Sequence, residues 1–259
     1  MHADNFVLQQ YLDRIGFSRS AFAGPAKADL ASVAGIMRCQ LFSVPFENLD
    51  VQAGKVISLV PEEIVDKIVG RHRGGYCYEV NGLFAMALQA LGIDYQFVAA
   101  RPMFYPVKRP KTHMAIVLTL DGEHYLCDLG FGSYGIRAPM RLGALDVEVA
   151  QDGDTFMLSK TSERDYLLKA LVEGEWGNQY GFDLSPQEWI DFVPANYLNS
   201  THPDAIFVQK LVIVLHRAEG RSIFVGDTLK TVSGAGVEKR VVAPEERAAM
   251  LSEVFGLKA

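Results

Sequence analysis

The chain has 259 residues, of which 49% are hydrophobic, and its formal net charge at pH 7 is −6. A chain of this length and composition can bury a substantial core, as one or two domains with a small extra layer. The acidic balance argues against nucleic acid or an acidic membrane surface as the main partner.

Targeting and redox signals are sparse. No uninterrupted apolar run approaches the ~20 residues of a membrane-spanning helix, and the N-terminal MHADNFVLQQ has no basic segment followed by an apolar one. We therefore expect a cytoplasmic protein without a membrane partner. The three cysteines, Cys39, Cys77 and Cys127, include no CxxC pair, so we expect neither a disulfide framework nor a metal site.

Three helices are predicted before residue 70. Apolar residues at helical spacing predict a helix over 7–15 that ends at Gly16. A second helix, with one apolar face, is expected over 29–42. A third, over 61–69, has proline in its first turn and stops at Gly70.

The segment SVPFENLD, residues 43–50, separates the second and third of these helices. Pro45 cannot continue a helix, and an acidic Glu47 lies among apolar neighbours. If Glu47 is buried it needs a cationic partner, for which Arg71 and Arg73 are the candidates. Otherwise it is solvated, as most glutamates are.

The stretch RGGYCYEVNGLFAMALQALG, residues 73–92, carries the main chemical signal. Two glycines precede Cys77 by a few positions, and an apolar run with helical spacing continues to Gly92. Cys77 should therefore lie where a glycine turn becomes the first turn of a buried helix. Unpaired N–H groups and the helix dipole favour a thiolate there. The alternative is a buried cysteine that serves as a small hydrophobic residue.

After Gly92 the pattern changes to strands. Three runs, 95–100, 113–120 and 123–129, are rich in β-branched and aromatic residues. Asp121-Gly122 between the last two is a signal for a two-residue hairpin turn, which pairs residue 120 with residue 123.

This register selects one histidine–carboxylate pair. It makes His113 the diagonal neighbour of Asp128 on one face, roughly 7–8 Å away at the backbone. His124 shares that face but lies about 13 Å along the strand from Asp128, and His72 stands among arginines whose charge disfavours protonation. A cysteine at a helix start, with a histidine held by a carboxylate, is the nucleophile–base–orienter arrangement, here Cys77, His113 and Asp128.

Four motifs occur in order along the chain, and shorter stretches between and beyond them extend the pattern. The motifs are PFENL (45–49), RGGYCYEVNGLF (73–84), TH (112–113) and DLGFG (128–132); the shorter stretches are YLDRIG (11–16), DFVPANYLNSTHP (191–203) and FGL (255–257). The set covers most of the chain and resembles the arylamine N-acetyltransferases of bacteria.

The resemblance implies a function and a site. It implies acetyl-CoA as cosubstrate, with no permanently bound cofactor and no metal. The acetyl group would pass through an acyl-cysteine intermediate to an arylamine, an arylhydrazine or an N-hydroxyarylamine. The residues that the resemblance assigns are Cys77, His113 and Asp128 as the triad, Thr112, Gly130, Phe131 and Gly132 at the donor and acceptor pocket, and Glu47 with Arg73 as structural support.

The resemblance also implies an α+β fold in three regions. A helical bundle, 1–88, would carry the nucleophile; a central β-barrel, 89–190, would carry the histidine and aspartate; and a mixed α/β lid would occupy 191–259. The core would be a Cys–His–Asp arrangement like that of cysteine proteases.

Local patterns in the last part of the chain predict further elements. Strands are expected over 207–215, 223–225 and 237–242. A helix start is expected at Ser185-Pro186, with serine as the cap, and a terminal helix over 244–254.

The sequence departs from the family pattern at two places and leaves alternatives open. Pro102 stands where the family usually has an aliphatic acceptor-site residue, and no serine precedes Phe207. Both bear on acceptor preference and donor contacts. The same triad also suits an amide synthase that closes a macrolactam or a thiol hydrolase, and a non-enzymatic globular protein is a further alternative.

Overall fold

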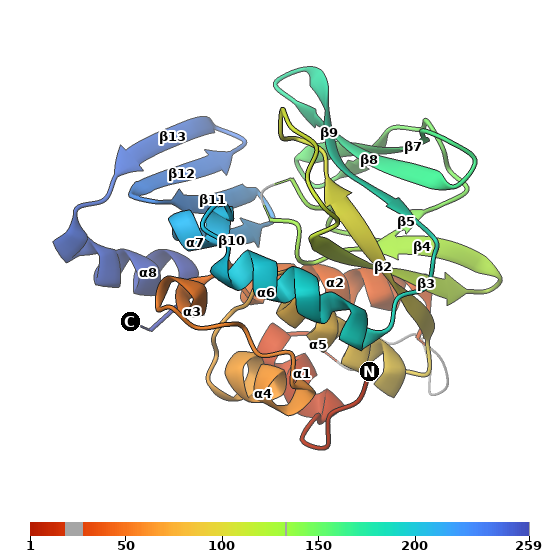
Figure 1. Ribbon diagram of the computed structural model, residues 1–259, viewed down its shortest axis with the longest axis horizontal. Coiled ribbons are helices and arrows are strands. Elements are labelled where there is room, and N and C mark those ends of the chain that lie inside the picture. The colour runs from red at the N-terminus through yellow and green to blue at the C-terminus, as the bar shows by residue number, and fades with distance from the viewer. Residues whose placement is uncertain (19–27, 133, 259) are drawn as a thin grey trace.

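The computed structural model describes residues 1–18, 28–132 and 134–258, and it contains two antiparallel sheets with helices around them (Figure 1). In the view of Figure 1, helices α1, α4 and α5 occupy the lower part, and the two sheets lie above them on the left and the right. The mixed α/β class expected from the sequence is confirmed.

The predicted N-terminal helices are confirmed with small changes at their ends. Gly16 ends the first helix in a left-handed conformation, with φ of 70°. The Asp29 side chain caps the second by accepting the N–H of Ser32. Their bounds are α1 Leu8–Ile15, α2 Leu30–Ser43 and α4 Pro61–Val65, the last continued by a π-helical turn over Asp66–Gly70. A further short helix, α3 Leu49–Gln52, was not predicted.

Helix α5, Cys77–Ala90, lies in the interior. Every residue from Cys77 to Leu88 is buried, which explains why this run is apolar on nearly every side instead of along one stripe. A buried helix holds its first residue rigidly, so Cys77 is fixed relative to the strands that pack against α5.

The central region is an eight-stranded antiparallel sheet in the order β5-β4-β3-β2-β9-β8-β7-β6. It curls into a half-barrel. A closed barrel was expected, but among the described residues the edge strands β5 and β6 do not pair with each other, so the expectation of closure is wrong. The strands are β2 Asp94–Pro102, β3 His113–Leu120, β4 Glu123–Cys127, β5 Met140–Arg141, β6 Val149–Gln151, β7 Asp154–Lys160, β8 Asp165–Val172 and β9 Glu175–Asp183.

The hairpin register predicted for β3 and β4 is confirmed. Leu120 pairs with Glu123, and the ladder continues to Ile116 opposite Cys127. Strand β4 ends at Cys127, so Asp128 is the first residue after this strand. It lies at the end of the hairpin where β3 begins with His113.

A five-stranded sheet in the order β1-β10-β11-β12-β13 joins the start of the chain to its end. The short strand β1, from the PFENL motif, pairs with β10, a long-range contact that local pattern does not reveal. The strands are β1 Phe46–Glu47, β10 Val212–Arg217, β11 Gly220–Val225, β12 Thr228–Ser233 and β13 Gly236–Val241.

Two local predictions in this region are wrong, and one strand was not predicted. Phe207 lies in a helical turn, α7 Ile206–Gln209, and the residues that pair with β1 are Ile213 and Val214, further along the chain. Strand β12 was not foreseen. No helix starts at Ser185, because the backbone of Gln187 pairs with Phe97 instead; a 3₁₀ turn begins at Trp189 and leads into α6, Val193–Thr201.

The chain ends in α8, Arg247–Phe255, after a 3₁₀ turn that begins at Pro244, as predicted. One large apolar core surrounds α5, and a smaller one lies between α8 and the five-stranded sheet. In the parts of the chain that the structure describes, no helix is both long and apolar enough to cross a membrane.

Candidate active site

Cys77 is the first residue of α5 and is 3% exposed. Burial raises the pKa of its thiol, and the negative charge of Asp128 raises it further. The backbone N–H groups of Met114 and Tyr78 donate toward the sulfur and oppose this rise. The position of Cys77 in the sequence suggested that the helix start would favour a thiolate. The raised pKa indicates the opposite, so the thiol needs a base.

His113 and Asp128 meet as the register predicted. Nε2 of His113 lies 2.6 Å from Oδ2 of Asp128, and both side chains are buried. The other carboxylate oxygen of Asp128 accepts the backbone N–H of Gly130 at 2.8 Å. A carboxylate held on both oxygens cannot rotate away from the imidazole, and Nδ1 is the ring nitrogen of His113 that Asp128 does not contact.

Asn81, which sequence reasoning missed, ties three elements together behind this pair. Its Nδ2 donates to Oδ1 of Asp128 at 3.1 Å and to the carbonyl of Met114 at 2.8 Å. Its Oδ1 accepts the N–H of Leu129. Asn81 is one helical turn after Cys77, and a polar residue among the mostly apolar residues of this buried helix was the available signal.

Tyr180 on β9 was also missed. Its ring packs 5.0 Å from the ring of His113 and 4.8 Å from that of Phe131, measured between centroids. Burial, followed by the nearby Asp128 carboxylate, raises the pKa of the Tyr180 hydroxyl. The tyrosine thus covers the imidazole on the side of the half-barrel and keeps water from the His113–Asp128 contact.

Two glycines of the DLGFG motif are needed for different reasons. A Cβ at Gly130 would lie 2.4 Å from the Cα of Cys77, so a side chain there would displace the cysteine itself. Gly132 has φ of 91°, a conformation that favours glycine, and its carbonyl accepts from Nε2 of His216 at 3.0 Å.

Thr112 is held through its backbone. Its carbonyl accepts from the Tyr78 hydroxyl at 2.9 Å and from Nδ2 of Asn199 at 3.0 Å. These bonds come from α5 and α6, so the turn that precedes His113 is fastened to both helices.

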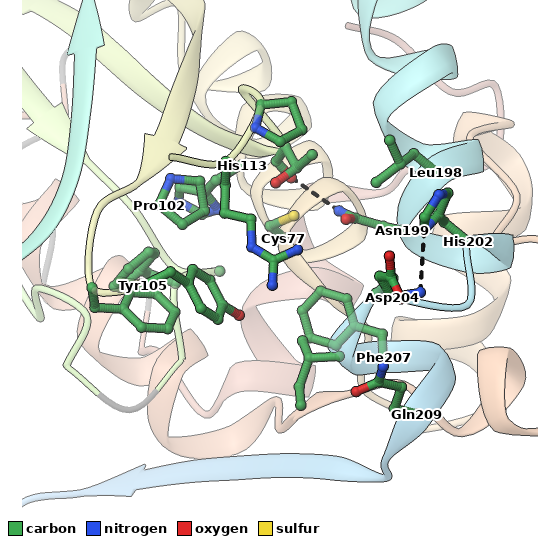
Figure 2. A pocket seen from close by; sticks show the side chains of 18 of the residues that line it. Cys77, Pro102, Tyr105, His113, Leu198, Asn199, His202, Asp204, Phe207 and Gln209 are labelled. Carbon is green, nitrogen blue, oxygen red and sulfur yellow. Dashed lines mark hydrogen bonds between the residues drawn. The ribbon is translucent and has the colours of Figure 1, made fainter. Parts of the chain in front are cut away.

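A cavity of about 350 Å³ opens onto Cys77 and His113 (Figure 2). Figure 2 shows Pro102 and Tyr105 on one side of it and Leu198, Asn199 and Phe207 on the other. Of the residues assigned from the resemblance, Cys77, Thr112, His113, Gly130 and Phe131 line this cavity, as do both departures from the family pattern, Pro102 and Phe207. Gly132 is not among the described residues that line it.

The predicted pair of Glu47 and Arg73 is in contact. Two guanidinium nitrogens of Arg73 donate to Oε1 of Glu47 at 2.7 and 3.0 Å, and Glu47 is fully buried. The structure adds a buried Lys67, whose Nζ lies 2.7 Å from both Asp50 and Glu79.

Glu79 links this cluster to the cysteine. One of its oxygens accepts the N–H of Tyr76, which immediately precedes Cys77, and the other accepts from Lys67. Burial first, and then the charge of Glu47, raise the pKa of Glu79 to about 7 in spite of Lys67.

The rejected alternatives lie elsewhere. His72 is exposed and lines a separate pocket near α1. His124 is exposed and lies 3.0 Å from the Thr119 hydroxyl. Cys127 is buried and Cys39 is partly buried, and both are free thiols.

Known proteins resemble this chain over most of its length. The family model of N-acetyltransferases matches residues 29–259. The chain is 33% identical to the arylamine N-acetyltransferase of Mycolicibacterium smegmatis over 218 residues, which cover 82% of this chain and 77% of that protein. It is 29% identical to the arylamine N-acetyltransferase of Escherichia coli strain K12, covering 97% of this chain and 89% of that one.

Solved structures show the same likeness. The structure of Mycobacterium marinum arylamine N-acetyltransferase in complex with CoA superposes with a TM-score of 0.88 at 29% identity, covering 96% of this chain and 92% of that one. The family model extends over nearly the whole sequence and the relatives match over most of their length. The chain therefore belongs to the arylamine N-acetyltransferase family.

Proposed function

We propose that this protein transfers the acetyl group of acetyl-CoA to an arylamine, an arylhydrazine or an N-hydroxyarylamine through a thioester on Cys77. The observation that carries the proposal is the 2.6 Å contact of His113 with Asp128, beside a buried cysteine in one cavity. The relative from Mycobacterium marinum, solved in complex with CoA, supports the identity of the donor.

In the first half-reaction Nδ1 of His113 accepts the Cys77 proton. The thiolate attacks the acetyl carbonyl, the new S–C bond forms, and the bond to the sulfur of CoA breaks. The imidazolium returns its proton to the departing CoA thiolate. Asp128 selects the tautomer of His113 and steadies its positive charge during this step.

In the second half-reaction the amine nitrogen attacks the acetyl-cysteine. His113 takes a proton from the amine, the C–N bond forms and the S–C bond breaks, and the proton passes to the Cys77 thiolate. Thr112 and Phe131 form part of the wall against which donor and acceptor bind in turn. Glu47 and Arg73 act from outside the cavity, since they hold the turn that presents Cys77.

Three further features are part of the proposal. The division into a bundle of residues 1–88, a β region of 89–190 and a lid of 191–259 is our proposal for the folding units. A cytoplasmic location follows from the need for acetyl-CoA. Amide synthase and hydrolase activities use the same triad, but the relatives are named as acetyltransferases, so transfer to a small amine is preferred.

The test separates the two half-reactions. Acetyl-CoA alone should place a single acetyl group on Cys77, seen by intact mass and peptide mapping, and addition of an arylamine should remove it. Double-reciprocal plots should be parallel. Intersecting lines without an adduct would instead indicate direct transfer, and loss of the adduct to water as fast as to the amine would indicate a hydrolase.

A further inference from the structure

Asn48, the residue between β1 and α3, is fully buried and makes three hydrogen bonds to one distant stretch of backbone. Its Nδ2 donates to the carbonyl of Phe207 at 2.7 Å and to that of Lys210 at 2.9 Å. Its Oδ1 accepts the N–H of Val212 at 2.7 Å. A single side chain thus holds the segment that leads from α7 into β10, 159 residues further along the chain at Phe207.

Gln52, one helical turn after Asn48, contacts the same segment from the surface. Its Nε2 donates to the carbonyls of Phe207 at 2.7 Å and Val208 at 3.1 Å. The last carbonyls of a helix find no donor within it, and a helix as short as the four residues of α7 is not stable by itself. Asn48 and Gln52 supply these donors, so the position of α7 depends on them.

Helix α7 forms part of the wall of the catalytic cavity. Its Phe207 lines the cavity, and Figure 2 shows this ring across the cavity from Tyr105. The Phe207 ring packs 5.6 Å from the ring of Tyr76, which immediately precedes Cys77. Asn48 is not among the described residues that line the cavity, so it reaches the cavity through α7.

Building on the acetyl transfer proposed above, we infer that Asn48 is a positioning residue for substrate binding, which holds α7 by its carbonyls and so sets the place of Phe207 on the cavity wall. Asn48 takes no part in proton transfer. Donor and acceptor enter one cavity in turn, so a displaced α7 weakens the binding of both. The contact of His113 with Asp128 is held from α5 by Asn81 and does not depend on α7.

The experiment compares the wild type with Asn48→Asp and Gln52→Ala. Asn48→Asp keeps the shape of the side chain and the acceptor for Val212 but loses both donors. The KM for acetyl-CoA and the KM for aniline should each rise by at least about fivefold, because two hydrogen bonds are lost. The kcat should change by less than about twofold, since the binding that is lost is the same in ground and transition states.

Gln52→Ala tests the same contact at an exposed residue, where a failure to fold is not expected. It should raise both KM values in the same way but by less than Asn48→Asp. Gln10→Ala, the same substitution at an exposed position on α1, is the matched control and should leave both KM values unchanged.

A double-mutant cycle tests whether Asn48 acts through Phe207. Phe207→Ala should itself raise both KM values, and Asn48→Asp should add less than about a further twofold in that background. The same cycle with Gln52→Ala repeats the test from the surface. Full additivity in the cycles would show that the two side chains do not act through this wall.

Two kinetic outcomes would overturn the inference. A fall in kcat with both KM values unchanged would mean a smaller fraction of active molecules, and hence a merely structural role. Unchanged kinetics in folded Asn48→Asp, or in Gln52→Ala where Asn48→Asp does not fold, would show that these contacts do not shape the cavity.

Hydrogen–deuterium exchange keeps the inference distinct from the proposed function, because it needs no turnover. Exchange of the amides of 206–210 should be faster in Asn48→Asp than in the wild type, with exchange in α5 unchanged. Calorimetric titration of the unacetylated protein with CoA should show weaker binding in the same variant. These results would support the inference even if no acetyl adduct formed on Cys77, whereas equally faster exchange throughout the protein would refute it even if acetyl transfer were established.

Discussion

At the scale of single residues, the buried thiol of Cys77 needs a base, and we propose His113 for this role. Burial and the Asp128 charge raise the pKa of the thiol, so the helix dipole alone does not supply the nucleophile. In the proposed mechanism the thiolate forms together with a His113 imidazolium, and Nε2 of His113 lies beside Asp128. The charge on His113 thus offsets both the desolvation of Cys77 and its repulsion by the carboxylate.

Replacing the nucleophile should abolish transfer without unfolding the protein. Cys77→Ala and Cys77→Ser should both lose acetyl transfer and the acetyl adduct, because neither side chain forms a thioester. Activity, intact mass and circular dichroism check this. Cys39→Ala, at a partly buried thiol outside the cavity, is the control; strong turnover in Cys77→Ala would exclude the proposed intermediate.

Variants of His113, the proposed base, and of Asp128, which orients it, should show whether these residues act in proton transfer or only in packing. Asp128→Asn keeps the shape of the side chain and should lower kcat/KM by at least ~10²-fold, since a related triad loses about 10⁴-fold. His113→Gln should move the pH profile of Cys77 alkylation upward, because the thiolate loses its ion-pair partner. His72→Gln should not. An upward shift in His72→Gln without a shift in His113→Gln would contradict the prediction and indicate that His72 is the base.

At the scale of secondary structure elements, the turn before α5 rests on a buried charge cluster. Lys67 contacts Asp50 and Glu79 and lies 3.8 Å from Glu47. Three carboxylates share Lys67 and Arg73, and Glu79 is the one that reaches the backbone next to Cys77. The cluster therefore couples the stability of this turn to the protonation of Glu79.

The free energy of unfolding should depend on pH through Glu79. Its pKa is about 7 in the native state against 4.5 as its ordinary value. Between these values the native state holds a proton that the unfolded chain has released, so stability falls as the pH rises through this window. Urea denaturation from pH 5 to 8 should show a flatter dependence in Glu79→Gln than in the wild type. Exposed Glu253→Gln is the control, and parallel curves for all three proteins would contradict the prediction.

At the scale of the whole molecule, one carboxylate joins the two sheets. Asp154 on β7 accepts from Arg137, in the segment after β4, and from Arg221 on β11 at 2.5 Å. Burial and the charges of these arginines lower the pKa of His216 to about 3, so His216 is neutral when it donates to Gly132. The five-stranded sheet is thereby fastened to the loop that carries Phe131.

Removing this carboxylate should loosen the junction between the sheets. Asp154→Asn leaves two buried guanidinium groups without their shared charge, at a cost of ~3–5 kcal/mol. Urea or thermal denaturation should show this loss, and exposed Asp94→Asn should change stability by less than about 0.5 kcal/mol. Equal, small effects would show that the junction does not depend on Asp154.

The sequence by itself determined the features that short-range patterns encode. The Asp121-Gly122 turn admits one register, and that register brings His113 to Asp128 without any knowledge of the fold. Helix periodicity and the glycine turn placed Cys77 at the start of a buried helix. Capping residues and prolines located most helix ends, because these signals act within a single turn.

Only the tertiary structure decided the features that depend on distant neighbours. Burial by the surrounding helices and strands raised the pKa of Cys77, and a strand far along the chain brought Tyr180 over His113. The pairing of β1 with β10 starts at Ile213, and Phe207 lies before it in a helical turn. Desolvation and long-range strand pairing depend on residues that are distant in the sequence, so a local stretch of sequence does not predict them.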